Sequence, residues 1–350
     1  IEKNACAILS ARPDDYPRAE HFALSNCPLP ELSEGQIRVK NHYLSIDAAM
    51  RGWVSNERNY LEPVAIGDVM RSLAVGEVIA SQHADFQIGE QVTGWFGWQQ
   101  FANVEASQII RKIHEQGHTQ APPLSSSLGV LGLNGITAYL ALNNIGRPQA
   151  GETVLVSTAA GAVGSIVGQL AKLAGCRVLG LTGSDKKVKQ CTEAFGYDAA
   201  LNYKNHTNTQ DLQQAIAQLA GDSSNGNGID IFYDNTGGTI ADAAFASLNM
   251  NARVIQCGTA SIGNWDPLPE GPRKERYFIT KRLLQQGFVI FDHLEKWPET
   301  VDKLCDLIRT QKLQYSEEIH HGLAQAPQAL EQLYSGDNQG KSLVKVEHQD

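Results

Sequence analysis

Residues 153–164 read TVLVSTAAGAVG, and this stretch decides the fold class. Thr153–Val156 is a short apolar run of the kind that forms a strand buried on both faces of a parallel sheet. Apolar side chains then recur at helical spacing, at Val163, Ile166, Val167, Leu170 and Leu173. A buried strand that runs directly into an amphipathic helix predicts the first strand–helix unit of an α/β domain.

The turn between this strand and this helix, Ala159–Gly164, matches the motif G-x-G-x-x-G with Ala159 at the first glycine position. In that motif, Gly161 lets the backbone approach a pyrophosphate, and Gly164 lets the helix pack on the strand. The helix N-terminus adds free N–H groups and a partial positive charge. A tight turn without a ligand has the same sequence, but the position of the motif favours a dinucleotide site. The backbone groups that contact the dinucleotide are expected to be those of Ala160, Gly161, Ala162 and Val163.

Strand and helix patterns alternate downstream of this turn. Five further strands are predicted: Arg177–Leu181, a short strand that ends at Leu201, Ile229–Tyr233, Arg253–Cys257 and Phe288–Phe291. A helix is predicted at Trp297–Leu313. Six strands with intervening helices predict a doubly wound parallel sheet.

The flanking parts of the chain have a different character. Gln36–Tyr43 alternates apolar and polar residues, as half-buried strands do, and Ala74–Ala80 and Gln91–Trp95 are further strand candidates. Many short strands separated by glycines favour a small barrel or sandwich. Glu317–Val346 returns to mixed character and ends in a strand-like SLVKV. We therefore expect a nucleotide-binding domain of residues 126–315, inserted into a β-rich domain of residues 1–125 and 316–350.

Composition argues against several classes of protein. The 350 residues carry a net charge of −9, which disfavours nonspecific binding to nucleic acid or to an anionic membrane surface. No apolar stretch reaches the roughly 18–20 residues that cross a bilayer, and no signal-peptide pattern opens the sequence. Six scattered cysteines indicate reduced thiols rather than a disulfide framework. These features predict a soluble, cytoplasmic protein, and they leave open whether it acts on a small molecule.

The end of the second predicted strand separates NAD from NADP binding. An acidic residue there would bind the ribose 2′-hydroxyl of NAD. The segment Gly183–Lys187 has no acid at the strand end, and Asp185 is expected to cap the following helix. Lys187 then suits the 2′-phosphate of NADP, although an ordinary exposed lysine gives the same pattern. We expect NADP, with Gly183 and Ser184 beside its phosphate.

No zinc site is predicted. The sequence has no C-x-x-C pair, and His320 and His321 are adjacent in an extended segment, so their side chains point apart. His83, His114 and His118 have no nearby cysteine or convincing carboxylate cluster. Without zinc, alcohol dehydrogenation loses its Lewis acid.

Seven segments carry a resemblance to a known family. They are YLSIDAAMRG (43–52), LGVLGLNGITAY (128–139), AAGAVGSIVGQLAKLAGCRVLGLTGSDKK (159–187), FYDNTGG (232–238), RVIQCGTAS (253–261), QGFVIF (286–291) and GDNQGKSLV (336–344). With them the chain resembles the zinc-independent medium-chain dehydrogenase/reductase superfamily, in its branch of prostaglandin, 2-alkenal and curcumin reductases. The resemblance implies a GroES-like β-barrel catalytic domain with an inserted Rossmann domain, NADP(H) as cofactor, and a homodimer.

The resemblance also assigns roles to single residues. Lys187 and Tyr203 stand where the family contacts the 2′-phosphate. The remaining cofactor positions are Thr137, Asn235, Cys257, Gly258, Phe288, Ile290 and Asn338. Each of them could instead be structural, and Tyr203 and Phe288 could be core aromatics.

The implied reaction is hydride transfer from NADPH to the β-carbon of an α,β-unsaturated aldehyde or ketone. Negative charge then develops on the carbonyl oxygen and needs a hydrogen-bond donor. Tyr60 matches a substrate-pocket tyrosine and is the candidate catalytic residue, and Arg51 and Trp265 are further pocket candidates. Gly263 replaces the tyrosine that relatives commonly carry in S-x-Y-N, so a hydroxyl often given a catalytic role is absent. A quinone reductase and a non-catalytic NADPH-binding protein are the alternatives.

Overall fold

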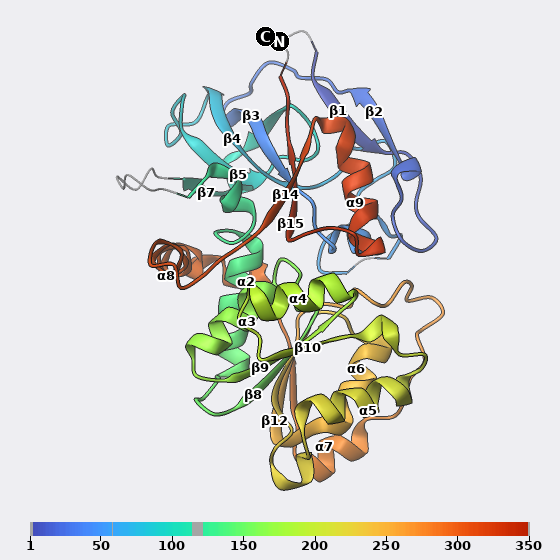
Figure 1. Cartoon of the computed structure of the whole chain (residues 1–350). Helices are drawn as coiled ribbons and strands as arrows, with labels where there is room; N and C mark the ends of the chain where they lie inside the picture. Colours follow the sequence, from blue (N-terminus) through green and yellow to red (C-terminus); the bar gives the residue numbers. More distant parts are fainter. Residues whose placement is uncertain (1–2, 58, 114–121, 349–350) are drawn as a thin grey trace. The chain divides into compact units, whose positions relative to one another are not determined.

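The computed structural model describes residues 3–57, 59–113 and 122–348 (Figure 1). The chain divides into two compact units. One consists of Leu133–Ser316, and the other combines Ile1–Gly132 with Glu317–Asp350. We call them the central unit and the split unit. No helix in the described part of the chain is long and apolar enough to cross a membrane.

The central unit is built on a six-stranded sheet in the order β10-β9-β8-β11-β12-β13. The strands are β8 (Thr153–Ser157), β9 (Arg177–Thr182), β10 (Ala199–Asn202), β11 (Ile229–Asp234), β12 (Leu248–Gln256) and β13 (Leu284–Gly287). All neighbouring pairs are parallel. The chain builds outward from β8 to β10 and then returns to the other side of β8, so the order reverses between β8 and β11. The predicted doubly wound parallel sheet is confirmed.

One helix precedes the first strand, and the others follow the strands in turn. The helices are α2 (Leu133–Ala141), α3 (Gly164–Leu173), α4 (Asp185–Glu193), α5 (Thr209–Ala220), α6 (Gly238–Ala244), α7 (Glu275–Lys281) and α8 (Trp297–Arg309). Side chains alternate across a strand, so each strand feeds both faces of the sheet. On one face, Leu155 and Phe232 pack in a core with Ile216 of α5 and with α6. On the other face, Ile231 and Ile255 lie against Gly146, at the end of the π-helical turn Leu142–Gly146 that follows α2. Burial on both faces explains why β8 reads as an uninterrupted apolar run.

The sixth strand lies four residues earlier than the sequence predicted. Phe288–Phe291 is not a strand; β13 is the polar run Leu284–Gly287, which pairs with β12 and is exposed at all four positions. It is an edge strand, so apolar patterning could not reveal it. Phe288 and Ile290 are apolar because they are buried just after the strand ends.

The split unit contains a seven-stranded sheet in the order β14-β15-β3-β4-β5-β7, with β6 pairing β3. The strands are β3 (Gln36–Ser45), β4 (Leu73–Ser81), β5 (Gln91–Trp95), β6 (Phe101–Glu105), β7 (Ile109–Ile113), β14 (Glu317–His321) and β15 (Lys341–Lys345). The β-rich domain is confirmed. The strand pairs among the described residues do not close into the barrel that was expected.

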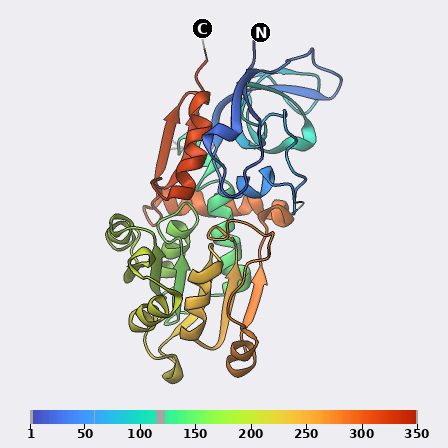
Figure 2. The same cartoon turned by 90° about the vertical axis from the view of Figure 1, so that its right-hand side faces the viewer.

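The two ends of the sequence meet within the split unit. β15 pairs antiparallel with β3, and helix α9 (Ala326–Ser335) contributes Ala329 and Leu330 to the core of the unit. That core also holds Trp53, at the end of the short helix α1 (Met50–Val54), and Trp98, both fully buried. Figures 1 and 2 show α9 and β15 beside the amino-terminal strands.

A disulfide joins Cys6 and Cys27, which corrects the expectation of reduced thiols throughout. Cys6 lies in β1 (Ala5–Leu9), and Cys27 directly follows β2 (Phe22–Asn26). These strands pair antiparallel and bring the two Cα atoms within 5.9 Å, a distance that a disulfide spans. The sequence did not reveal this disulfide. The two cysteines are 21 residues apart, and sequence spacing does not show which strands are neighbours. Cys176, Cys191, Cys257 and Cys305 form no disulfide.

Replacing Cys6 with Ser is expected to lower the free energy of unfolding of the oxidised protein by about 3 kcal/mol, because the open chain regains the entropy of a loop of this length. Urea unfolding without reductant measures the change. The matched control is Cys305→Ser, which removes a partly exposed thiol outside any disulfide and should cost less than about 1 kcal/mol. Thiol titration of the denatured wild type should find four groups before reduction and six after it. Six thiols before reduction would contradict the bond.

Candidate active site

The predicted cofactor residues of the central unit gather at the carboxyl edge of its sheet. Ala160–Val163 follow β8, Gly183–Lys187 follow β9, and Tyr203 follows β10. The remaining strand ends supply Asn235 after β11, Cys257 and Gly258 after β12, and Phe288 and Ile290 after β13. Open α/β sheets bind ligands at this edge, beside the position where the strand order reverses.

The turn after β8 is shaped by contacts that leave no room for larger residues. A Cβ atom on Gly164 would lie 2.2 Å from the carbonyl oxygen of Thr158, and one on Gly161 would lie 2.8 Å from Thr158 Cγ2. Thr158 itself adopts a left-handed conformation with φ 54°. The reversal therefore falls one residue before Ala159, which explains why alanine is accepted at the first glycine position.

Tyr197 supports this turn from below and was not predicted from the sequence. Its hydroxyl donates to the carbonyl oxygen of Gly164 at 2.7 Å, and its ring fills the space beside Gly168 and Gly180. Burial raises the pKa of this hydroxyl well above its ordinary value, so it stays a donor. Two glycines, one in α3 and one in β9, were the available signal that a large side chain crosses at this point.

The corner after β9 holds Ser184, Lys187 and Tyr203. Ser184, and not Asp185, caps α4: the backbone N–H of Lys187 donates to Ser184 Oγ at 3.2 Å. Asp185 instead accepts a hydrogen bond from Asn202 Nδ2 at 2.8 Å, because β10 lies beside β9. A Cβ atom on Gly183 would lie 2.9 Å from the hydroxyl of Tyr203. Because Gly183 has no side chain, the Tyr203 hydroxyl can lie beside the first turn of α4, the turn that carries Lys187.

Asp234, at the end of β11, ties three strand ends together and was also missed. It is fully buried. Its Oδ1 accepts from Ser157 Oγ at 3.0 Å, from the N–H groups of Thr236 and Gly237 at 2.9 and 3.0 Å, and from the Thr236 hydroxyl at 3.0 Å. Its Oδ2 accepts from Gln256 Nε2 at 3.0 Å. These bonds fix the ends of β8, β11 and β12. The cofactor candidates Asn235 and Gly258 follow two of these ends.

Asn235 and Gly258 are held closely at these strand ends. Asn235 Nδ2 donates to the carbonyl oxygen of Ser157 at 2.8 Å. A Cβ atom on Gly258 would lie 2.7 Å from the carbonyl oxygen of Asn235. Only glycine fits at this position, because the backbones at the ends of β11 and β12 approach each other closely at the edge of the site.

Thr137, Tyr233 and Cys257 form a second group, in which Thr137 and Tyr233 are buried and Cys257 is partly exposed. The Tyr233 hydroxyl lies 3.3 Å from the carbonyl oxygen of Thr137 and 3.5 Å from Cys257 Sγ. Burial raises the pKa of the Cys257 thiol to about 11, so this cysteine is a neutral thiol at physiological pH and not a nucleophilic thiolate. Thr137 Oγ1 is buried and has no hydrogen-bond partner among the described residues. A buried hydroxyl without a partner fits a polar ligand at this edge.

Phe288 and Ile290 are buried after the end of β13. The N–H of Phe288 donates to the carbonyl oxygen of Gln256 at 3.1 Å, and its ring stacks on His293 with centroids 5.0 Å apart. The segment is therefore anchored by one backbone bond and one ring contact. Trp265 lies in the exposed segment between β12 and α7, and 43% of its surface is accessible.

The other three predicted residues belong to the split unit. Arg51, in α1, places its guanidinium 4.8 Å from the ring centroid of Tyr16. Tyr60 follows α1 and is half exposed, with 50% of its surface accessible. Asn338 lies before β15, and its Nδ2 donates to the carbonyl oxygen of Gly340 at 3.0 Å.

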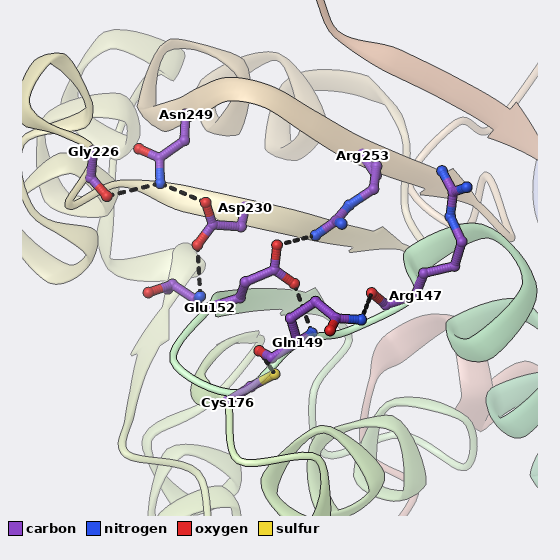
Figure 3. Close-up of polar contacts among 9 residues, drawn as sticks. Arg147, Gln149, Glu152, Cys176, Gly226, Asp230, Asn249 and Arg253 are labelled. Atoms are coloured by element: carbon purple, nitrogen blue, oxygen red, sulfur yellow. Dashed lines mark hydrogen bonds and ion pairs between the residues drawn. The ribbon is translucent and has the colours of Figure 1, made fainter.

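A groove of about 490 Å³ lies at the opposite, amino edge of the central sheet. Its charged residues are already paired: Arg177 donates to the carbonyl oxygens of Leu219 and Ala220 at 2.7 and 2.6 Å, and Asp230 accepts from the N–H of Thr153 at 2.8 Å. Figure 3 shows Asp230 held by Asn249 and, next to it, the ion pair of Glu152 with Arg253. We interpret this cluster as structural, because its hydrogen bonds and ion pair hold the amino ends of neighbouring strands together.

Metal ligands do not gather in the described part of the chain, which contains no group of three or more His, Cys, Asp or Glu residues arranged to hold an ion. His320 and His321 lie in β14, and His83 follows β4. His114 and His118 lie outside the described residues.

Comparison with known proteins gives matches to both halves of the sequence. A family model described as the N-terminal domain of oxidoreductase matches residues 6–112, and one described as zinc-binding dehydrogenase matches residues 162–306. The NADPH-dependent curcumin reductase of Escherichia coli is 37% identical over 99% of this chain and 97% of that protein. The NADP(+)-dependent 2-alkenal reductase of Nicotiana tabacum is 37% identical over 98% of this chain and 97% of that protein.

The structural match is equally extensive. The crystal structure of CurA from Vibrio vulnificus in complex with NADPH is 36% identical to this chain and superposes with a TM-score of 0.88. The match covers 99% of this chain and 100% of that one.

Proposed function

The chain belongs to the zinc-independent medium-chain dehydrogenase/reductase superfamily and is an NADP-dependent oxidoreductase, and on this premise we propose its substrate class and the roles of its residues. The substrates are α,β-unsaturated aldehydes and ketones, whose carbon–carbon double bond is reduced. The observation that carries this proposal is the set of strand ends at the carboxyl edge, together with the full-length likeness to enone- and enal-reducing relatives.

The residues present fit NADPH. The pyrophosphate would lie on the backbone of Ala160–Val163, where glycines allow close approach. The 2′-phosphate would lie between Lys187 and Tyr203, beside Gly183 and Ser184. Thr137 Oγ1, buried and without a partner in the described structure, would bond to the nicotinamide end. The rest of that end would contact Asn235, Cys257, Gly258, Phe288, Ile290 and Asn338.

When bound, NADPH supplies hydride to the β-carbon of the substrate. The residues of the chain then have two tasks, to orient the double bond and to stabilise charge on the carbonyl oxygen. We assign the second task to the Tyr60 hydroxyl, with Arg51 and Trp265 lining the pocket. Since Gly263 brings no hydroxyl, the α-carbon proton comes from water or from Tyr60 in this proposal.

The test is NADPH consumption, followed at 340 nm, with a short alkenal, a long alkenone, a curcumin-like dienone and a simple quinone. Preferential turnover of the unsaturated carbonyl compounds, with a saturated carbonyl product, is the expected result. Turnover of the quinone alone would make the chain a quinone reductase. Tight NADPH binding without turnover of any acceptor would make it a non-catalytic NADPH-binding protein, with Gly263 as the cause.

Replacing Tyr60 with Phe is expected to lower kcat by about tenfold and to leave the Kd for NADPH within about twofold, because one hydrogen bond to the developing charge is lost from a half-exposed side chain. Steady-state kinetics and fluorescence titration give the two values. Tyr43→Phe is the control, since Tyr43 lies in β3 of the same unit and has no assigned role. If kcat were equal in both variants and the wild type, Tyr60 would be a packing residue.

The domain assignment, the oligomeric state and the location are part of the same proposal. We assign catalysis to residues 1–125 and 316–350, and cofactor binding to residues 126–315. A homodimer is supported by the edge strand β13, which is exposed, and by the exposed side chains of Leu284 and of Ile279 in α7. Light scattering on the purified protein tests it.

A cytoplasmic location is proposed from the four cysteines that form no disulfide, although the Cys6–Cys27 bond is uncommon in reducing compartments. Cell fractionation, with the thiols blocked at lysis, tests both the location and the state of this bond.

A further inference from the structure

A buried ion pair in the split unit lies directly before α1. Lys341, the first residue of β15, places its Nζ 2.6 Å from Asp47 Oδ1 and 2.7 Å from the carbonyl oxygen of Ile46. Only 5% of either charged side chain is accessible. Removing both charges from water is costly, and their attraction and hydrogen bonds offset that cost only in part. The pair is therefore weak evidence of a contribution to stability.

The acid of this pair is held on every side. Asp47 Oδ2 accepts from Ser45 Oγ at 2.5 Å, and the N–H of Ile46 donates to the carbonyl oxygen of Ser342 at 3.2 Å. The carbonyl oxygen of Asp47 accepts the N–H of Met50 at 3.0 Å, which begins α1. The position of Asp47 therefore sets where α1 starts.

Lys341 has a second acid within its strand pair but is bonded to Asp47. Glu317 lies opposite Lys341 in the register of β14 and β15, and its Oε2 accepts from Ser125 Oγ at 2.7 Å. Its Oε1 is buried without a hydrogen-bond partner among the described residues. Burial raises the pKa of Glu317, although the charge of Lys341 acts in the opposite direction. The ammonium is thus directed toward the start of α1 instead of toward its strand neighbour.

From α1, contacts continue to the segment that carries Tyr60. A Cβ atom on Gly52 would lie 2.4 Å from Asn59 Nδ2, so the Asn59 side chain rests on α1. The N–H of Val64 donates to the carbonyl oxygen of Trp53 at 2.8 Å and closes the loop between them. Tyr60 lies within this loop, and Arg51 lies on the helix at its base.

We propose that Lys341 is a positioning residue for the substrate site: through Asp47 it fixes the start of α1 and hence the placement of Arg51 and Tyr60. The inference rests on the proposed function for its kinetic part. Its structural part, the ordering of the described residues 48–57 and 59–62, does not depend on the reaction.

The experiment compares Lys341→Met with the double variant Lys341→Met/Asp47→Asn. The single variant leaves an unpaired buried carboxylate, so its Tm should fall by about 10 °C. The double variant removes that charge with little change of shape, so its Tm should recover by at least half. Its KM for the unsaturated carbonyl substrate should nevertheless stay raised at least fivefold, with the Kd for NADPH within twofold, because the bonds to Asp47 and Ile46 are still missing.

Hydrogen–deuterium exchange of residues 48–62 supplies the readout that does not need activity. Exchange in this segment should be faster in the double variant than in the wild type, and unchanged in α9. The control is Lys345→Met, which removes an exposed lysine from the same strand and should alter neither KM nor exchange.

Two results would overturn the proposal. One is recovery of KM together with Tm in the double variant, which would make the pair purely structural. The other is unchanged exchange of residues 48–62. If the wild type reduced no unsaturated carbonyl compound, the proposed function would fail, while the exchange experiment would still decide the role of Lys341.

Discussion

Replacing Asp234 with Ala is expected to lower the free energy of unfolding by about 3–5 kcal/mol and to abolish measurable NADPH binding. The buried carboxylate accepts five hydrogen bonds, and its removal leaves the buried donors of Ser157, Thr236 and Gly237 without this acceptor, while Gln256 Nε2 keeps only its bond to the carbonyl oxygen of Gly258. Because those donors lie at three strand ends, the loss spreads over the edge of the site. Urea unfolding and fluorescence titration with NADPH measure the two effects.

Two further variants make this result interpretable. Asp234→Asn keeps one oxygen for the bonds made by Oδ1 and should lose about half as much stability. Asp222→Ala removes an exposed carboxylate that caps a turn of the same unit, and it should lower stability far less than Asp234→Ala does. An Asp234→Ala protein as stable as the Asp222→Ala protein would show that the strand ends do not depend on this acid.

Replacing Lys187 with Ala is expected to raise the Kd for NADPH by about 10- to 100-fold, since a charge-assisted hydrogen bond to phosphate is lost. The Kd for NADH, which lacks the 2′-phosphate, should change less than about twofold. The two titrations are done on the same preparation, so that a general loss of folded protein would affect both equally.

The control is Lys186→Ala, because Lys186 is the exposed neighbour on the same first turn of α4. It should change the Kd for NADPH by less than about threefold. Equal losses for NADPH and NADH in Lys187→Ala would remove the basis for assigning the 2′-phosphate to this residue.

Local patterns were sufficient for the frame of the central unit. The apolar run of β8, the glycines after it and the spacing of α3 specify a strand–turn–helix unit without reference to distant residues. The strand ends that follow then fall on one edge, because parallel strands connected by helices all point the same way. This is why most of the cofactor positions named from the sequence lie together.

What the sequence did not reveal depends on contacts between distant segments. Tyr197 supports the glycine turn from about thirty residues downstream of Gly164, and β13 is a strand only because β12 offers it an edge. In the sequence, Asp234 does not differ from other polar residues, because its role depends on the five hydrogen bonds that it accepts, including those from two other strands. The Cys6–Cys27 bond likewise depends on which strands are neighbours. Asp185 was assigned the cap that belongs to Ser184, because two adjacent residues have nearly equal capping preference.

The division of the split unit has a consequence for synthesis of the protein. Strand β3 is made before residues 133–316, but one of its neighbours, β15, is made after them. Residues 133–316 are complete before that neighbour exists, so the nascent chain can build its central sheet while residues 43–45 of β3 still lack the partner strand that β6 does not reach. Such long-range closure is slow and leaves an unpaired strand edge open to other chains. Crowded or overheated cells should therefore lose newly made copies sooner than finished ones.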